Sequence, residues 1–523
     1  MIEHQIRNVL GASLEKLNIS TPLDQIVIET PRNEEHGDYA TNVAFSLTKA
    51  LKKSPALIAQ EISTTINDSA HSSILAKPIN GFINFFLSDE YLHKEVTSIN
   101  DNYGKSDKGK GERYLIEYVS ANPTGPLHIG HGRWAAIGDS LVKMLKEVGF
   151  DARSEFYIND AGNQINKFRE SVLAAKKGQP IPEDGYHGSY VLDLAHVDRD
   201  PVLAMLEDQE KTLELFRCSF DNWINESSLH QRNLVSQLIE VLKQKNVTYE
   251  KDGALWFRST DYDDDKDRVL IRENGEPTYF AADIAYHYDK FQRDTDHAVN
   301  IWGADHHGYV QRMKAALQVI LDEKIRSQNK TIDDYFTVII GQLVKLFRSG
   351  EEVRMSKRTG DMITLREVID EIGVDAARYF LAMRSNDQVL DFDLNLAKEQ
   401  SSNNPVYYVQ YAHARICSII RKVENYSADT ALNRLLEAEE RKLLVKLIRF
   451  PGLLQKAARD YSPYMLTQYM EELATTFHAF YQRCKVIGDD AAIMDQRLTY
   501  IEKASVIIKK GLNLIGVDAP QSM

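Results

Sequence analysis

The sequence has little cysteine and no long apolar stretch, and both shortages narrow the classes of protein it can belong to. Its three cysteines, Cys218, Cys417 and Cys484, are too far apart for the paired spacings of a zinc site or a disulfide framework. So few thiols are typical of a reducing compartment, and we therefore expect a cytoplasmic protein. No apolar run is long enough to span a bilayer, and residues 1–11 are amphipathic rather than a signal peptide, so we expect no membrane partner.

An excess of positive charge is also missing. The chain has 63 Lys and Arg against 76 Asp and Glu, a formal net charge of −13, which by itself does not favour binding to a polyanion. The charge is uneven, because residues 405–523 contain 16 Lys and Arg against 13 Asp and Glu, while residues 1–404 carry a net −16. The mildly basic C-terminal part permits local contacts with phosphates but does not prove them.

The most informative stretch predicts a strand, a loop, a helix and a second strand. Residues 114–119 are β-branched and aromatic, as in a buried strand, and residues 151–159 have the same character. Two prolines and a glycine end the first strand. A helical pattern then runs from Gly130 to a stop at Gly149. This order predicts parallel strands with a ligand at their carboxyl ends.

Two histidines lie at the predicted start of that helix. Because His128 and His131 are three residues apart, their imidazoles can point at the same place. A helix N-terminus offers unpaired N–H groups and partial positive charge, which suit a phosphate. Gly130 has no side chain to keep a flat base away from the backbone. For this motif alone, the alternative that the histidines only cap and pack the helix stays open.

Two motifs together resemble the signatures of class I aminoacyl-tRNA synthetases. The first is the HIGH signature, in which His128-Ile129-Gly130-His131 follows Asn122-Pro123-Thr124-Gly125-Pro126-Leu127. The second, far downstream, resembles the KMSKS loop, which in this family closes over the phosphates of ATP. It agrees with the pattern at Met355, Ser356 and Lys357 and departs from it at Arg354 and Arg358.

The resemblance implies a role for each of these residues. The catalytic side chains would be His128, His131 and Lys357, which stabilise charge on the phosphates. ATP, with Mg²⁺, would be bound by both motifs and by a later turn, through Asn122, Pro123, Thr124, Gly125, Pro126, Leu127, Ile129, Gly130, Asp305, His306, Arg354, Met355, Ser356 and Arg358.

Other segments resemble the arginyl-tRNA synthetases in particular. Residues 31–42 and 81–85 are similar to the appended N-terminal domain of that family, and residues 157–164 to a turn of its catalytic domain. Residues 404–415 and 477–484 are similar to its anticodon-binding bundle. The resemblance covers nearly the whole chain. It implies that L-arginine is activated with ATP, with release of pyrophosphate, and transferred to the 3′ end of tRNA(Arg).

An arginine substrate requires carboxylates placed to accept a guanidinium group. The family pattern implies Glu117 and Asn122 near the first strand, and Gln311 as a weaker candidate. Tyr279 and Asp283 are four residues apart and can share a helical face, so that one covers the guanidinium while the other pairs with it. The alternatives are an ordinary strand-end charge for Glu117 and a solvent-facing helix residue for Asp283.

The predicted fold class is a multidomain α/β protein with a Rossmann-like class I catalytic domain. An N-terminal α/β module is expected at 1–100, the catalytic domain at 101–375 with an insertion at about 166–255 and the KMSKS-like loop at 354–358, and an all-α anticodon-binding bundle at 376–523. We expect a monomer. A minority of the bundle's aromatics should stack on RNA bases, and the candidates are Tyr407, Tyr408, Tyr411, Phe477, Phe480 and Tyr481.

Two segments suggest metal sites, and both are better explained otherwise. Residues 261–267 begin like a calcium loop, but Lys266 stands where glycine is needed and Arg272 where the bidentate Glu belongs. Asp305, His306 and His307 lie on one short loop, where adjacent side chains rarely all face one ion, so a nucleotide role is favoured. We expect no protein-bound metal and no zinc.

Three other functions were weighed. A cysteine-type class I synthetase would need a set of metal-binding thiols. A nucleotidylyltransferase would leave the N-terminal module and the bundle unexplained. A non-catalytic tRNA-binding relative would have no use for His128, His131 and Lys357.

Overall fold

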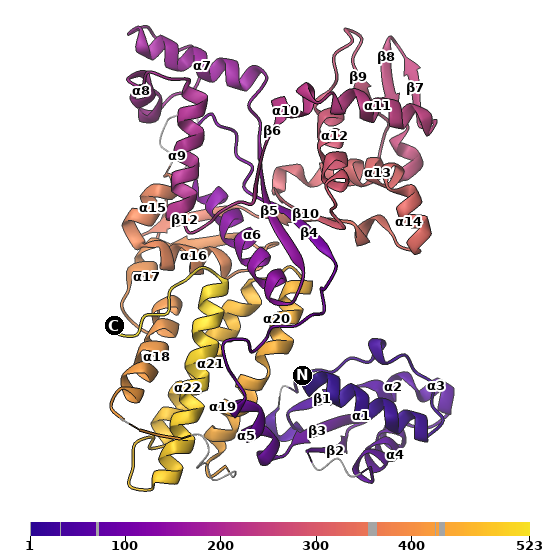
Figure 1. The fold of residues 1–523 in the computed structure, drawn as a ribbon, viewed down its shortest axis with the longest axis vertical. Helices are drawn as coiled ribbons and strands as arrows, with labels where there is room; N and C mark the ends of the chain where they lie inside the picture. Colours follow the sequence, from indigo (N-terminus) through magenta and orange to yellow (C-terminus); the bar gives the residue numbers. More distant parts are fainter. Residues whose placement is uncertain (1, 32, 70–72, 354–362, 424, 428–434) are drawn as a thin grey trace.

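A computed structural model of the chain (Figure 1) describes every residue except 1, 32, 70–72, 354–362, 424 and 428–434. In the described part, the central sheet has five parallel strands in the order β11-β10-β4-β5-β6. These strands are β4 (Arg113–Glu117), β5 (Asp151–Ile158), β6 (Asn222–Asn225), β10 (His297–Gly303) and β11 (Phe336–Gly341). Because they are parallel, all their carboxyl ends lie at one edge of the sheet.

Helices connect these strands. They are α6 (Ile129–Glu147), α12 (Tyr279–Gln292), α13 (Val310–Ile320) and α14 (Asp322–Gln328). The predicted strands at 114–119 and 151–159 correspond to β4 and β5. The first ends early because Val119 and Ser120 have φ values of 69° and 40°, which take the backbone out of the extended conformation.

Two lobes project from the central sheet on opposite sides (Figure 1). One consists of α7 (Asn163–Lys176), α8 (Ser189–Ala195) and α9 (Pro201–Leu215) around a small core of its own. The other combines α12 and α13 with α10 (Glu226–Gln231), α11 (Leu234–Gln244) and the antiparallel strands β7 (Thr248–Lys251), β8 (Ala254–Phe257) and β9 (Arg268–Ile271). The sequence reasoning missed β6, which lies between the lobes and belongs to the central sheet.

The N-terminal module has helices packed on a three-stranded antiparallel sheet of order β1-β3-β2. Its elements are α1 (Ile2–Lys16), β1 (Tyr39–Thr41), α2 (Val43–Ser46), α3 (Thr48–Leu51), α4 (Pro55–Asn67), β2 (Ile74–Ile79), β3 (Phe82–Leu87) and α5 (Asp89–Thr97). A single bridge joins Glu29 to Ala40 outside these strands. Helices α3 and α4 are separate, since Lys52 has a φ of 52° and Pro55 begins α4.

The C-terminal part is a helical bundle next to a second small sheet. That sheet contains β12 (Val344–Arg348), β13 (Glu351–Glu352) and β14 (Leu390–Asp393). In the chain, the helices α15 (Leu365–Ile372) and α16 (Val374–Ala382) come between β13 and β14, and α17 (Leu394–Lys398) follows β14. The bundle contains α18 (Pro405–Ile420), α19 (Ala438–Ile448), α20 (Phe450–Arg459), α21 (Tyr464–Arg483) and α22 (Ala491–Leu514). The predicted fold class is thereby confirmed.

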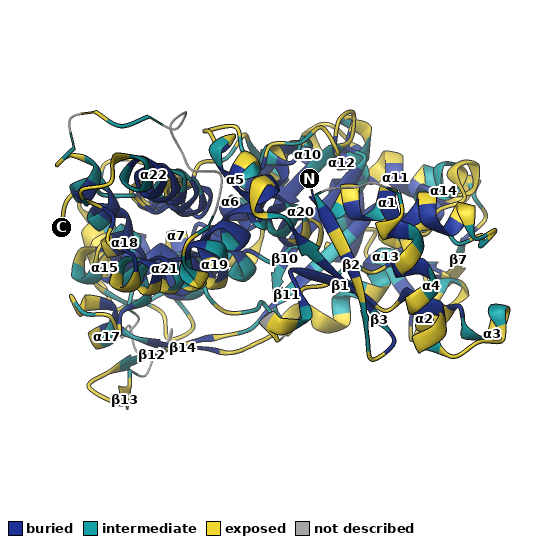
Figure 2. Ribbon diagram, turned by 90° about the horizontal axis from the view of Figure 1, so that it is seen from below, coloured by how far each residue is buried: buried dark blue, intermediate teal, exposed yellow. Residues whose placement is uncertain are grey.

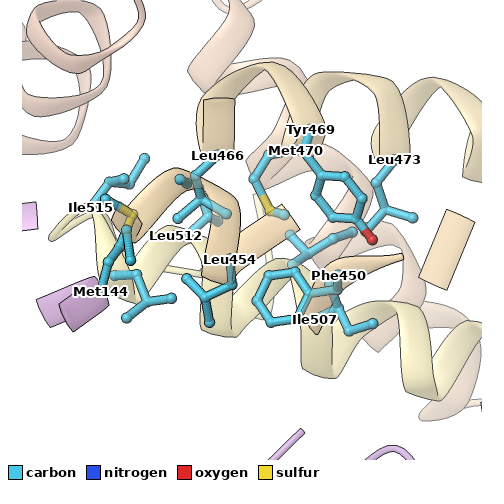
Figure 3. Close-up of a cluster of buried hydrophobic side chains, with 14 of the residues drawn as sticks. Met144, Phe450, Leu454, Leu466, Tyr469, Met470, Leu473, Ile507, Leu512 and Ile515 are labelled. Carbon is cyan, nitrogen blue, oxygen red and sulfur yellow. The ribbon is translucent and has the colours of Figure 1, made fainter. Parts of the chain in front are cut away.

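Helix α6 shares its core with the bundle. Met144, near the end of α6, is fully buried and lies beside Leu512 and Ile515, as Figure 3 shows. Buried residues run along both α6 and α22, whereas β13 is exposed (Figure 2). The helix that begins at the two histidines is therefore fixed at its other end by bundle side chains. None of the described helices is both long and apolar enough to cross a membrane.

Candidate active site

The two histidines at the start of α6 cap that helix and face the same way. Nδ1 of His128 accepts hydrogen bonds from the backbone N–H groups of Gly130 (3.1 Å) and His131 (3.4 Å), and Nδ1 of His131 accepts from the N–H of His128 (3.2 Å). The rings are stacked with centroids 3.7 Å apart. A neutral imidazole that accepts at Nδ1 carries its proton on Nε2, so the caps fix both rings as Nε2–H donors.

A cavity of about 880 Å³ opens beside these rings. It is lined by both histidines, by residues of the loop 122–126, by residues of the segment 183–190, which leads into and begins α8, and by Thr364 and Glu367. Its volume is in the range of sites that enclose a nucleotide-sized ligand. The N-terminus of α6 adds partial positive charge at this wall, so the cavity suits an anion.

The predicted ATP residues differ in their access to this cavity. Asn122, Thr124, Gly125 and Pro126 line it. Leu127 and Ile129 are buried in the main core. Asp305 and His306 lie exposed on the 3₁₀ helix η4 (Ala304–Tyr309), with the carboxylate of one 3.5 Å from Nε2 of the other. The structure thus brings the loop and the histidines together and leaves the Asp305–His306 turn apart from the cavity lining.

The KMSKS-like residues Arg354, Met355, Ser356, Lys357 and Arg358 lie outside the described residues. The chain that follows them is fixed next to the histidines. Thr364 forms a β-bridge with His128, and the N–H of Leu365 donates to the carbonyl of Leu127 at 2.7 Å.

Glu117, at the carboxyl end of β4, is buried within a polar network. Its carboxylate accepts hydrogen bonds from Ser120 Oγ and from Asn300 Nδ2, both at 3.0 Å, and from Lys290 Nζ. Asn300 also contacts Nε2 of His287 at 2.9 Å. The negative charge of Glu117 is therefore balanced by partners inside the protein. An ordinary strand-end charge, exposed to water, would not need these partners.

Asp283, on α12, has no ion pair with any described residue that is comparable to the one between Glu117 and Lys290. Tyr309 donates a hydrogen bond to its carboxylate. Burial raises the pKa of Asp283 to about 7, and the charges of Glu226 and Glu117 add to the rise against the opposing hydrogen bond from Tyr309 and the charge of Lys290. The solvent-facing alternative for this residue is therefore wrong, because a carboxyl in water would ionise near pH 4.

Glu226 and Tyr157 complete a cluster of acidic and tyrosine side chains around Asp283, and we call this cluster of Glu117, Glu226 and Asp283 with Tyr157 and Tyr309 the carboxylate pocket. Burial raises the pKa of Glu226 as well, and raises that of Tyr157 far above its ordinary value, with the nearby charges of Glu226 and Asp283 adding to it. Several acidic groups that lie close together and are largely shielded from water favour a cationic ligand, which would relieve their repulsion.

Sequence reasoning missed Glu226 and Tyr309. Glu226 follows β6 directly, so it lies at a carboxyl end of a strand that the sequence pattern did not predict. Tyr309 comes two residues before the candidate Gln311, which is exposed on α13. Tyr157 was included in the polar turn at 157–164 but was not singled out.

Tyr279 and Asn122 take positions away from the carboxylates of the pocket. Tyr279 is the first residue of α12, one turn before Asp283, and is 62% exposed. Nδ2 of Asn122 donates to Gln164 Oε1 at 2.8 Å, at the wall of the histidine cavity. Among the residues that the structure describes, no group of three or more His, Cys, Asp or Glu side chains is arranged to hold a metal ion.

Models of known families match three stretches of the chain. Residues 4–87 match the arginyl-tRNA synthetase N-terminal domain. Residues 192–421 match the catalytic domain of the class I (R) tRNA synthetases, and residues 409–523 match the DALR anticodon binding domain.

Similar proteins give the same assignment along the full length. Arginine–tRNA ligase 1 of Halalkalibacterium halodurans is 43% identical, covering 100% of this chain and 99% of its own, and arginine–tRNA ligase of Staphylococcus aureus is 40% identical, covering 98% of each. Arginyl-tRNA synthetase of Thermus thermophilus has the same fold, with a TM-score of 0.83 at 21% identity and complete coverage of both chains. With these matches over its whole length, the chain belongs to the arginyl-tRNA synthetase family, whose members are class I aminoacyl-tRNA synthetases.

Proposed function

We propose that the carboxylate pocket and the histidine cavity are two halves of one active site, which joins L-arginine to ATP and passes the arginyl group to tRNA(Arg). The observation that carries this proposal is the pocket of Glu117, Glu226 and Asp283, because burial raises the pKa of Glu226 and of Asp283, and a bound cation would favour the ionised forms of both. Of the common amino acids, arginine offers a planar cation with donors on several sides, which several carboxylates can share.

In the first step an oxygen of the arginine carboxylate attacks the α-phosphorus of ATP. The bond from that phosphorus to the bridging oxygen breaks, pyrophosphate leaves, and arginyl-adenylate remains. In the second step a ribose hydroxyl at the 3′ end of tRNA attacks the acyl carbon, and AMP leaves. Neither step needs a nucleophilic side chain, so the protein acts by positioning and by stabilising charge.

The phosphates lie at the helix start on this proposal. His128 and His131 donate from Nε2, and Lys357, with Arg354 and Arg358 beside it, stabilises the leaving pyrophosphate. Because Thr364 is bonded to His128 and Lys357 is seven residues earlier, roughly 25 Å of extended chain at most separates the lysine from the histidines. ATP enters as its Mg²⁺ complex, in which the ion neutralises part of the phosphate charge.

The remaining predicted residues are assigned around the same two substrates. We assign Asp283 and Glu226 to the guanidinium, Tyr279 to its cover, and Glu117 and Asn122 to the positioning of arginine. The peptide groups of residues 122–130 and the side chains Met355 and Ser356 form the ATP surface. The Asp305–His306 turn is assigned to the ribose or adenine and Gln311 to the edge of the arginine site.

The tRNA is proposed to bind across the N-terminal module and the bundle. Phe477 and Phe480 are fully buried, so they support the bundle core and are not assigned to RNA. Tyr407 and Tyr411 are stacked at 6.2 Å with nearly parallel rings, and Tyr411 is 40% exposed, which suits stacking on splayed bases. Tyr408 and Tyr481 are assigned to the margins of this face.

Together with this function we propose the domain division 1–100, 101–375 and 376–523, a cytoplasmic location and a monomeric state. The monomer is tested by light scattering on the eluted protein, where a mass of twice 59.6 kDa would contradict it.

The deciding experiment is a charging assay of each amino acid with matched total tRNA. We expect acid-stable aminoacyl-tRNA only with arginine, and ATP–pyrophosphate exchange only when tRNA is present. Exchange driven by another amino acid and not by arginine would remove the proposal.

A further inference from the structure

One buried side chain of the α7–α9 lobe holds the loop that lines the histidine cavity. Gln209, on α9, is completely buried. Its Nε2 donates to the backbone carbonyls of Asn122 (3.1 Å) and Gly125 (2.8 Å). These two carbonyls lie on either side of the Pro123–Thr124 turn, so the single amide group of Gln209 binds both ends of the turn.

The orientation of this amide follows from its partners. Both contacts are carbonyl oxygens, which only accept, so the NH₂ end of Gln209 must face the loop. Its Oε1 has no hydrogen-bond partner among the described residues. The link to the loop thus depends entirely on the two donated hydrogen bonds.

A second residue of the same lobe continues the pattern. The hydroxyl of Tyr190, on α8, donates to the carbonyl of Thr124 at 3.1 Å. The carbonyls of residues 122, 124 and 125 are therefore all bound by side chains of the lobe, and the N–H of Thr124 adds a bond of 2.8 Å to the first of them.

This arrangement matters for an anion in the cavity. A backbone carbonyl oxygen carries partial negative charge and repels a phosphate at close range. Gln209 is fully buried and is not part of the cavity lining, so the two oxygens that it binds are turned into the protein and away from the cavity. Without its donors, rotation of the Asn122 and Gly125 peptide planes would be free to expose these oxygens to the ligand.

We propose that Gln209 is a positioning residue for ATP, which keeps two carbonyl dipoles of the 122–126 loop away from the phosphates, with Tyr190 assisting at Thr124. This inference rests on the proposed function, since it takes the histidine cavity as the ATP site. It assigns to the α7–α9 lobe a task in substrate recognition that is separate from the arginine pocket.

The test compares KM values for the two small substrates in tRNA charging by the full chain. Gln209→Met keeps the length of the side chain and removes both donors. We expect KM for ATP to rise about tenfold, because two hydrogen bonds are lost, while KM for arginine stays within about twofold. Tyr190→Phe removes one such bond and should raise KM for ATP about threefold.

Met205→Ala is the matched control, because Met205 is buried on the same helix within the lobe core and makes no bond to the loop. It should lower the melting temperature without a selective change in KM for ATP. If Gln209→Met does not fold, as judged by its thermal transition, Gln209→Asn decides the question in its place, because its shorter side chain keeps the amide but cannot reach both carbonyls.

Three results would overturn the proposal: an unchanged KM for ATP in Gln209→Met, equal increases for ATP and arginine, or the same ATP-selective increase in Met205→Ala. Failure of the wild-type protein to charge tRNA with arginine would instead remove the proposed function itself. The two failures are therefore distinguishable.

Discussion

The carboxylate pocket and the histidine cavity solve opposite electrostatic problems. The pocket gathers acidic groups in a partly dry place and leaves Asp283 and Glu226 with raised pKa values. The described lining of the cavity has both signs of charge, because Lys167 lies there together with Glu183, Asp184 and Glu367. It offers ring N–H donors and a helix N-terminus, whose partial charges need no counter-ion.

The difference shows where each substrate's binding energy is expected to come from. A cation in the pocket would be bound by carboxylates whose ionised form is unfavourable when the cation is absent. The same acidic groups therefore favour arginine binding and lower the stability of the ligand-free protein. An anion in the cavity would meet oriented dipoles, and on the proposed function Lys357 supplies the full positive charge that the reaction needs. Each of the following predictions perturbs one side and leaves the other as the control.

The largest expected effect is on the phosphate side. Lys357→Ala should lower kcat by a factor on the order of 10² to 10³, because the leaving pyrophosphate loses a cation that acts late in the reaction. KM for arginine should hardly change. Steady-state charging kinetics measure both quantities, and a parallel loss in arginine binding would contradict the separation of the two sides.

The next effect is on the carboxylate side. Asp283→Asn should weaken arginine by at least ~2 kcal/mol, or roughly 30-fold, because a buried guanidinium loses a counter-charge. KM for ATP should stay near that of the wild type. Glu276→Gln, at an exposed turn before α12, is the charge-matched control and should change neither KM. A wild-type KM for arginine in Asp283→Asn would exclude this carboxylate from the pocket.

A smaller effect concerns pH. Arginine needs Asp283 ionised, and the pKa of Asp283 is about 7 in the free protein. The value of kcat/KM for arginine should therefore rise about tenfold from pH 6 to pH 8. Tyr309→Phe removes a hydrogen bond that favours the ionised form, so the midpoint should move to higher pH. A flat profile in the wild type would show that another group controls arginine binding.

The last effect is on stability and is measured without either substrate. The pKa of Asp283 is higher in the folded protein than in the unfolded chain, where it is about 4, so the folded state holds the extra proton between pH 4 and pH 7. Stability is therefore lost as the pH rises through this window. Asp283→Asn, without arginine, should be more stable than the wild type by about 2 kcal/mol at pH 8, and the advantage should vanish near pH 4. Thermal unfolding at the two pH values measures it.

Sequence patterns predicted the features that depend on nearby residues. His128 and His131 follow from a helix start and a three-residue spacing, and Tyr279 with Asp283 from one helical turn. Glu226 was not predictable in this way, because its position depends on β6, whose four residues, Asn-Trp-Ile-Asn, are too few and too polar for a strand pattern. Gln209 escaped for a different reason, since its partners in the loop are more than 80 positions away.

The burial of Met144 against the C-terminal helices has a practical consequence for anyone dissecting the enzyme. A chain cut after residue 404 would lose Leu512 and Ile515, and it would leave the far end of the histidine-bearing helix with its apolar surface in water. Such a fragment should aggregate rather than work as an independent catalyst. The part that matches the anticodon binding domain is thus also a structural wall of the part to which the chemistry is assigned.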